Sequence, residues 1–375
     1  MNKHLHIIAF DVPYPPNYGG AIDVFYRIKS LHEKGVRIIL HCFVNDRPES
    51  PVLVDYCEQV YYYQRDLRFI KHLNRLPFSV VSRSHPELLN NLSKDDYPIL
   101  FEGLMSSYYL SHPDLSHRKK FYREANIEHY YYYHLALATK SFSKKIYFIA
   151  EAFKLYFFQK KIANADLIVA ISTTDTAYFK RMFPTIPVEF VPSFHANTQV
   201  TSVEGISDYI LYHANLSVPE NSKVAVYLIN HVFSKLTHKS VVAGMNPPKH
   251  LRQLISQFDN IELVANPDET QMRDLVANAQ IITLFTFQAT GMKIKLLESL
   301  FRGRHIIVNK HMLQGSGLDA LCFQADTPKQ GVALCNQLMQ IPFSQTEVVK
   351  RTNFLLPAYS NVHLSEIIIS AMNAF

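Results

Sequence analysis

Residues 290–309 of this chain read Thr290-Gly291-Met292-Lys293-Ile294-Lys295-Leu296-Leu297-Glu298-Ser299-Leu300-Phe301-Arg302-Gly303-Arg304-His305-Ile306-Ile307-Val308-Asn309. An apolar run at residues 281–285 comes directly before this stretch and predicts a buried strand. Gly291 predicts a turn in which the missing Cβ lets a ligand approach the backbone. The helix that follows has an apolar face made by Leu296, Leu297, Leu300 and Phe301. Gly303 predicts the end of that helix, and residues 306–308 predict the next strand.

The start of this helix has the properties of an anion site. Its free N–H groups, its dipole and the Lys293 ammonium would all attract the same negative group. Glu298, about two turns after Gly291, is the only carboxylate in the helix. The alternative interpretation is an ordinary strand–helix–strand unit with a solvated lysine pair.

Length and composition indicate a globular protein of two domains. The chain has 375 residues, of which 48% are hydrophobic and 19% charged. No apolar run approaches the roughly 20 residues that span a bilayer, and residues 5–10 form too short an apolar core for a signal peptide. The four cysteines form no CxxC pair, which fits a reducing cytoplasm. The net charge of +6 permits binding of anionic nucleotides or lipids without demanding nucleic acid.

The first half of the chain alternates predicted strands and helices. A strand at residues 5–10 is followed by a Pro-rich loop with Gly19 and Gly20, then by a helix at residues 22–34 and a strand at residues 36–43. The two glycines therefore lie at a strand-to-helix turn, where open α/β sheets bind ligands.

A predicted helix at residues 140–164 carries six lysines among aromatic side chains. Two interpretations remain open for it. A basic, aromatic-rich helix can lie on an anionic membrane, or it can pack against the core and leave its lysines in solvent.

The second half repeats the alternation after a polar linker at residues 196–208. The strands predicted at residues 209–217, 240–244 and 262–267 bring Asn215, Gly244, Val264 and Asn266 to strand ends. Asp268 predicts the N-cap of a helix at residues 268–277. The tail, residues 355–375, ends in an amphipathic helix.

Residues 290–309 resemble the donor-site segment of the retaining GT-B glycosyltransferases, in particular a family-4-like, bacterial glycan-assembly sub-branch. The usual pattern has two glutamates separated by seven residues; Glu298 matches the second, and Thr290 stands in place of the first. The Gly19-Gly20 loop and the strand at residues 165–172 are similar to segments of the same family. Residues 119–133 resemble its Arg-x-His-Asn-x-Glu-His-x-Tyr signature, although Ala125 replaces the first His.

The resemblance implies an α/β protein of the GT-B fold, with two Rossmann-like domains facing a central cleft. It implies an N-terminal acceptor-side domain at residues 1–200 and a nucleotide-sugar-binding domain at residues 207–355. Residues 356–375 would form a C-terminal helix that crosses back to the first domain.

The resemblance also implies a metal-independent hexosyltransferase, which agrees with the lack of an Asp-x-Asp motif. The donor would be a UDP- or GDP-linked sugar with no further cofactor, and the acceptor a glycan or lipid-linked glycan of bacterial surface polysaccharide synthesis. The implied catalytic residues are Lys293, Gly20 and His129. The implied donor-binding residues are Gly19, Gly20, Asn215, Gly244, Val264, Asn266, Thr290, Gly291, Met292, Lys293 and Glu298.

Three departures from the family pattern keep a second function open. Met105, Ala125 and Thr290 each replace a usual polar group. They favour a non-catalytic sugar-nucleotide-binding or scaffold subunit of a glycan assembly. A GT-B epimerase or phosphorylase is a third interpretation, although the pyridoxal lysine segment of phosphorylases is not visible.

Overall fold

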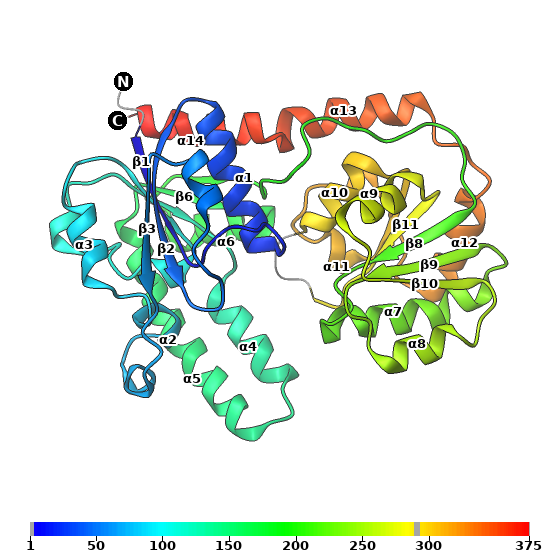
Figure 1. The fold of residues 1–375 in the computed structure, drawn as a ribbon, viewed down its shortest axis with the longest axis horizontal. Coiled ribbons are helices and arrows are strands. Elements are labelled where there is room, and N and C mark those ends of the chain that lie inside the picture. Colours follow the sequence, from blue (N-terminus) through cyan, green and yellow to red (C-terminus); the bar gives the residue numbers. More distant parts are fainter. Residues whose placement is uncertain (1–3, 289–292, 375) are drawn as a thin grey trace. The chain divides into compact units, whose positions relative to one another are not determined.

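The computed structural model describes residues 4–288 and 293–374. The chain forms two compact units (Figure 1). The first contains the chain as far as Ala196 together with the segment from Asn361 onward, and the second contains residues 197–288 and 293–360. The C-terminal segment therefore belongs to the same unit as the N-terminal half of the chain.

The first unit is built on a parallel sheet with the strand order β3-β2-β1-β4-β5-β6-β7. Its strands are β1 (His4–Ala9), β2 (Arg37–Val44), β3 (Gln59–Gln64), β4 (Ile99–Glu102), β5 (Lys120–Arg123), β6 (Leu167–Ala170) and β7 (Val188–Phe190). The order reverses between β1 and β4, and the crevice outside the carboxyl ends of the strands at such a switch point is where open α/β sheets bind ligands.

Helices cover both faces of this sheet, as the near-continuous apolar strands require. They are α1 (Gly19–Glu33), α2 (Phe78–Val81), α3 (Pro86–Leu92), α4 (Glu128–Ala138), α5 (Phe142–Phe158), α6 (Thr173–Met182) and α14 (Asn361–Asn373), with 3-10 turns η1 (Pro51–Asp55), η2 (Phe69–Leu73), η3 (Leu104–Ser106), η4 (Pro113–Leu115) and η5 (Gln159–Asn164). Along β1 the side chains alternate between two cores: Leu5 and Ile7 pack with α1 and α14, and Ile8 packs with α3, α5 and α6.

The final helix, α14, packs on α1, so the predicted return of the C-terminal helix to the first unit is confirmed (Figure 1). Leu364, Ile368 and Met372 enter the same core as α1. The Ser365 hydroxyl donates to Ser30 Oγ at 2.8 Å, beside these apolar contacts.

The second unit repeats the topology with the parallel order β10-β9-β8-β11-β12-β13. Its strands are β8 (Tyr209–His213), β9 (Lys239–Gly244), β10 (Ile261–Ala265), β11 (Ile281–Leu284), β12 (His305–Val308) and β13 (Phe323–Gln324). Here the switch point lies between β8 and β11, so both units have the doubly wound arrangement that the sequence predicts.

The helices of the second unit follow the predicted alternation. They are α7 (Pro219–His231), α8 (Lys249–Ile255), α9 (Glu269–Asn278), α10 (Ile294–Arg302), α11 (Lys310–Leu313), α12 (Pro328–Leu338) and α13 (Gln345–Tyr359), with 3-10 turns η6 (Phe233–Lys235) and η7 (Asp319–Leu321). Asp268 caps α9 in a capping box with Gln271, as predicted. The domain boundary expected at residue 356 falls inside α13. In the described part of the chain, every helix is too short or too polar to cross a membrane.

Gly303 ends α10, but the reason differs from the one expected. Its φ is −84°, so it does not form the left-handed cap typical of glycine. A Cβ at this position would lie 2.3 Å from Ile282 Cδ1 of β11. Glycine is therefore favoured because a larger residue here would displace the buried Ile282 side chain of the neighbouring strand.

Candidate functional site

The loops after β8 and β9 lie together at the switch point of the second unit. A Cβ on Gly244 would lie 1.8 Å from the Ala214 carbonyl oxygen, so only glycine fits where β9 ends. The N–H groups of Leu216 and Ser217 donate to the Met245 carbonyl at 3.0 and 3.1 Å. The structure thereby brings the loop of the predicted donor residue Asn215 against Gly244.

Two asparagines hold the next loop in a strained conformation. Asn246 and Asn266 have φ values of 47° and 54°, which few residues other than glycine adopt. The Asn246 N–H donates to Asn266 Oδ1 at 2.6 Å, and the Asn266 N–H donates to the Gly244 carbonyl at 2.9 Å. Asn266 and Gly244, both predicted donor-binding residues, are therefore in contact at the carboxyl ends of β10 and β9. Val264, a third predicted residue, is half-buried in β10. Such strain often accompanies binding sites.

The loop after β11 is held from both sides of the switch point. Its Phe287 N–H donates to Glu220 Oε1 of α7 at 2.9 Å. Asn309, which follows β12, accepts from the Thr286 N–H at 3.2 Å and donates to the Thr286 carbonyl at 2.7 Å. We did not predict Glu220 or Asn309 from the sequence. The available signal for Asn309 was a polar residue directly after a buried strand.

Lys293 and Lys295 occupy different environments at the start of α10. Lys293 is the N-cap, and its Nζ lies 3.4 Å from the Gln288 carbonyl oxygen. Lys295 extends over Tyr212 of β8, with its Nζ 6.0 Å from the ring centre. Burial lowers the pKa of Lys295 to about 8, although the Glu220 carboxylate acts in the opposite direction. The Lys295 side chain therefore lies on the sheet of its own unit.

Glu298 lies one turn further along α10 and is partly buried. Burial raises the pKa of Glu298 to about 7, while Arg302 lowers it and Glu269 raises it. Near neutral pH this carboxyl group can therefore accept or donate hydrogen bonds, which suits recognition of hydroxyl groups. The predicted donor residues Thr290, Gly291 and Met292 lie outside the described residues.

Three segments of the first unit meet around Phe10, at the end of β1. A Cβ on Gly20 would lie 2.7 Å from Phe10 Cζ, so a larger residue at the start of α1 would displace the Phe10 ring. Gly103, with a φ of +73°, follows β4 and faces both Phe10 and Ala125. The start of α1 at Gly19 and Gly20, the end of β4 and the segment after β5 thus share the switch point of this unit.

A buried ionic network lies beneath this cluster and comprises Asp23, Arg27, Glu102 and Arg123. Arg27 pairs with both Asp23 and Glu102, and Arg123 Nη2 lies 3.1 Å from Asp23 Oδ1. Burial alone would raise the pKa of Asp23, yet Arg123 and Arg27 hold it below its ordinary value. Arg123, the arginine of the signature that residues 119–133 resemble, therefore joins β5 to α1 and to the carbonyl groups of Val191 and Pro192 after β7.

Two further carboxyl groups are buried after β5. Glu124 Oε2 accepts from the Ile171 N–H at 3.1 Å, whereas its Oε1 has no hydrogen-bond partner among the described residues. Burial raises the pKa of Glu124 well above its ordinary value and that of Glu128 to about 7, with Arg83 lowering the latter. Arg83 also donates to the Phe10 carbonyl at 2.8 Å, which connects this pair to the Gly20 cluster.

His129 packs among aromatic rings of α4, α5 and α6. Its ring centroid lies 4.3 Å from Tyr130, 5.4 Å from Tyr156 and 6.2 Å from Tyr178. Burial lowers the pKa of His129, and Gln159 raises it through a side-chain hydrogen bond. These contacts favour a packing role, and the catalytic role of His129 stays a prediction.

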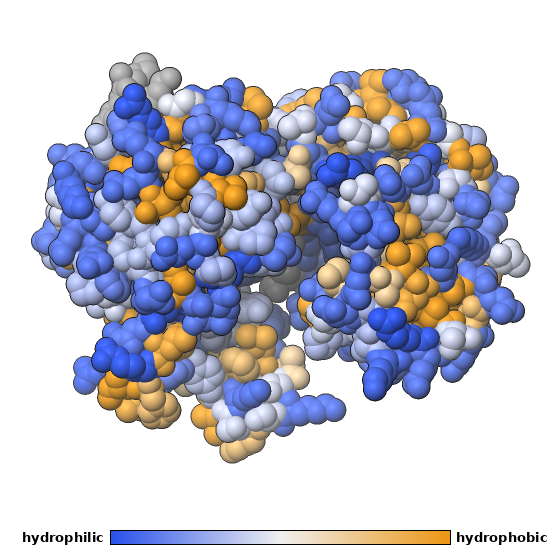
Figure 2. Space-filling view, in the orientation of Figure 1, coloured by the Kyte–Doolittle hydropathy of each residue, from blue (hydrophilic) through white to orange (hydrophobic). Residues whose placement is uncertain are grey.

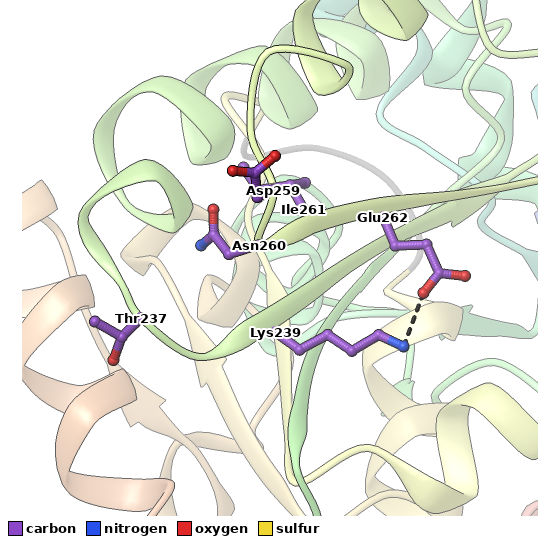
Figure 3. Close-up of a pocket in the computed structure, with 6 residues that line it drawn as sticks. All are labelled: Thr237, Lys239, Asp259, Asn260, Ile261 and Glu262. Carbon is purple, nitrogen blue, oxygen red and sulfur yellow. Dashed lines mark ion pairs between the residues drawn. The ribbon is translucent and has the colours of Figure 1, made fainter.

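The hollow drawn in Figure 3 lies at the opposite ends of the strands of the second sheet, where β9 and β10 begin. Its volume is about 680 Å³, and its lining includes Lys239 and Glu262, which form an ion pair at 2.8 Å. Asn260 points its amide toward the Phe233 and Leu236 carbonyls. The hollow is therefore separate from the carboxyl ends of the strands, which carry the predicted residues.

Among residues 4–288 and 293–374, no group of three or more His, Cys, Asp or Glu side chains is placed to hold a metal ion.

Comparison with known proteins places the fold. No family model matches the chain. A Klebsiella pneumoniae protein described as an uncharacterized 44.6 kDa protein in cps region is 24% identical over 330 residues, covering 83% of this chain and 84% of that protein.

Solved structures match over the whole chain at low identity. The Anabaena protein Alr3699/HepE in complex with UDP and glucose has a TM-score of 0.64 at 10% identity, covering 99% of this chain and 100% of that one. A trehalose-phosphate synthase from Burkholderia vietnamiensis has a TM-score of 0.62 at 8% identity, with the same coverage. The protein therefore has the GT-B fold of these glycosyltransferase structures.

Proposed function

We propose that this protein is a glycosyltransferase that moves a sugar from a UDP- or GDP-linked donor to a glycan or lipid-linked acceptor, with retention of configuration. Surface polysaccharide synthesis is the proposed setting. The description of the Klebsiella pneumoniae relative as a protein in a cps region supports this setting.

One observation carries the proposal: α10 begins at the switch point of the second unit with Lys293 and carries Glu298 five residues later. The Gly244 and Asn266 loops end their strands at the same edge of the sheet. A similar fold is known in complex with UDP and glucose. In the proposed complex, Glu298 holds the ribose hydroxyls and the start of α10 holds the diphosphate.

The proposed reaction breaks the bond between the anomeric carbon and the diphosphate oxygen, and the electron pair remains on the departing nucleotide. The acceptor oxygen forms the new glycosidic bond and transfers its proton to the departing diphosphate. Negative charge grows on the leaving oxygen, so fixed N–H groups and the Lys293 ammonium stabilise the transition state more than the ground state.

A screen of nucleotide sugars by thermal unfolding tests donor binding. A donor at about 100 times its Kd should stabilise the folded protein by about 2.7 kcal/mol. Release of UDP or GDP, measured with and without glycan acceptors, then tests transfer. The proposal is overturned if neither UDP- nor GDP-sugars raise the unfolding temperature.

The alternative is a non-catalytic sugar-nucleotide-binding or scaffold subunit. Phe10, Gly103 and Ala125 make part of the first unit's switch point apolar, which favours this alternative. Donor binding without nucleotide release, across acceptors prepared from surface polysaccharide, would support the scaffold function over the transferase.

A further inference from the structure

Helix α5 exposes a row of large apolar side chains. The row comprises Phe142, Ile146, Ile149, Phe153 and Phe157, each between 48% and 78% exposed. At about 100° per residue these positions fall within about 80° of one another around the helix. The opposite side of α5 is buried, with Leu155 and Phe158 in the core. The row is therefore a continuous outer face, which soluble monomers rarely expose without a binding role.

The tertiary structure adds a second segment to this face. The 3-10 turn η2 exposes Phe69, Ile70 and Leu73, each more than half exposed. Lys154 of α5 donates to the His72 carbonyl at 3.2 Å, and the His72 ring lies 5.7 Å from that of Tyr147. Residues some 80 positions apart thus form one region, which we call the apolar tip. Figure 2 shows apolar side chains gathered at the lower end of the first unit.

The charges around α5 have a single sign. Residues 130–164 contain six lysines and one acidic residue, Glu151. Glu151 is buried, accepts from the Phe78 N–H at 2.7 Å and pairs with Lys154. Lys140, Lys144 and Lys145 are exposed at one end of the row, and Lys160 is exposed at the other. The solvent-facing charge next to the apolar row is therefore positive.

We propose that the apolar tip docks onto the surface of a lipid bilayer that contains anionic headgroups. A basic amphipathic helix lies in the interface with its apolar face at the boundary of the acyl chains, and nearby lysines are attracted to an anionic surface. A second copy of the chain fits less well, because two such faces would bring their lysines together. If the proposed function holds, docking here would keep the first unit beside a lipid-linked acceptor. The docking itself does not require that the protein be catalytically active.

Co-sedimentation with vesicles tests the proposal. The wild-type protein should sediment with vesicles of phosphatidylglycerol and phosphatidylethanolamine in equal parts, and not with pure phosphatidylcholine. Binding should weaken at least about tenfold near 0.15 M salt relative to 0.01 M salt, because the Debye length shortens. The variant Phe142→Ser/Ile146→Ser/Phe153→Ser should lose binding about tenfold or more, and Lys144→Glu/Lys145→Glu should do the same.

Matched controls come from exposed positions in the second unit. Val349→Ser replaces an exposed apolar side chain on α13, and Lys329→Glu an exposed lysine on α12, and both should leave vesicle binding unchanged. All substituted side chains are exposed, so the unfolding temperature should stay within about 2 °C of the wild type in every variant. Nucleotide binding serves as a second check of folding and reports on the proposed function separately.

Three results would overturn the proposal. The first is no wild-type binding to anionic vesicles at low salt, and the second is equal binding by the tip variants. The third is a concentration-dependent dimer, seen by sedimentation velocity without lipid, that the triple variant abolishes. That last result would assign the apolar tip to a second copy of the chain.

Discussion

At the scale of single residues, Glu298 makes nucleotide binding depend on pH. Its pKa of about 7 reflects burial, so the group is protonated below pH 7 and ionised above it. A carboxylate accepts hydrogen bonds from hydroxyls more strongly than a neutral acid does. Nucleotide affinity should therefore rise between about pH 6 and pH 8. Glu298→Gln should weaken binding by about 1.5–3 kcal/mol at the higher pH, roughly 10–100-fold in Kd, and remove the pH dependence in calorimetry.

The same shift predicts the opposite effect on the ligand-free protein. The folded-state pKa lies above the ordinary value, so the folded protein favours the protonated form, and stability falls as pH rises from about 4.5 through 7. Glu298→Gln should then stabilise the unliganded protein at about pH 8. Glu262→Gln, at the other edge of the sheet and half exposed, is the control. A lower unfolding temperature for Glu298→Gln at that pH would contradict the buried carboxylate.

Substitutions of Lys293 and of Lys295 should differ in their effects on turnover and on stability. Lys293 caps α10, where a diphosphate would bind, so Lys293→Ala should lower turnover by on the order of 10²-fold. Lys295 lies over Tyr212, so Lys295→Ala should change the unfolding temperature and reduce turnover less. Rates of nucleotide release and thermal unfolding of both variants measure the difference. Equal loss of turnover in the two variants would show that Lys293 is not the main contact with the diphosphate.

At the scale of elements, the loops that end β8 and β9 depend on close packing. Gly244→Ala would place a Cβ 1.8 Å from the Ala214 carbonyl oxygen, so the two loops must separate. We expect a loss of about 1–3 kcal/mol in the free energy of unfolding, together with weaker nucleotide binding.

The matched control for this substitution is Gly331→Ala, in the interior of α12. There the nearest atom, Val232 Cγ2, would lie 3.3 Å from the new Cβ, and alanine is the better helix former by about 0.5–1 kcal/mol. Its stability in urea denaturation should stay within about 1 kcal/mol of the wild type. Similar losses in both variants would indicate a general intolerance of added volume in this unit and not a requirement of the β8–β9 edge.

At the scale of the whole molecule, the first unit is completed by the last helix of the chain. Leu364 of α14 is fully buried against α1, whereas Val362 on the same helix is half exposed. Leu364→Ala should destabilise the first unit by about 2–5 kcal/mol, and Val362→Ala by less than about 0.5 kcal/mol. In proteolysis during urea denaturation, Leu364→Ala should be cleaved within residues 4–196 at a lower urea concentration than the wild type. Cleavage at lower urea only within residues 197–360 would contradict the assignment of α14 to the first unit.

The sequence indicated the architecture because parallel strands that are buried on both faces leave a strong local pattern. Apolar runs such as residues 281–285, glycines at strand ends and the Asp268 cap depend on neighbours in sequence. The same locality explains why α10, its apolar face and its end at Gly303 were predictable. The physical reason for Gly303 was not predictable, because it depends on Ile282, which approaches this glycine from another strand.

By itself, therefore, the sequence determined two halves of alternating strands and helices and their strand ends, and its resemblance to the GT-B glycosyltransferases implied the doubly wound sheets and the return of the final helix. Only the tertiary structure decided which polar groups are buried and what they contact. Burial of Lys295 over Tyr212, the burial of Arg123 with Asp23 and the joining of η2 to α5 all involve segments far apart in the chain. The energy of a polar side chain depends on its surroundings and on the partners that satisfy it. No local pattern of residues encodes those surroundings, and the fold creates them.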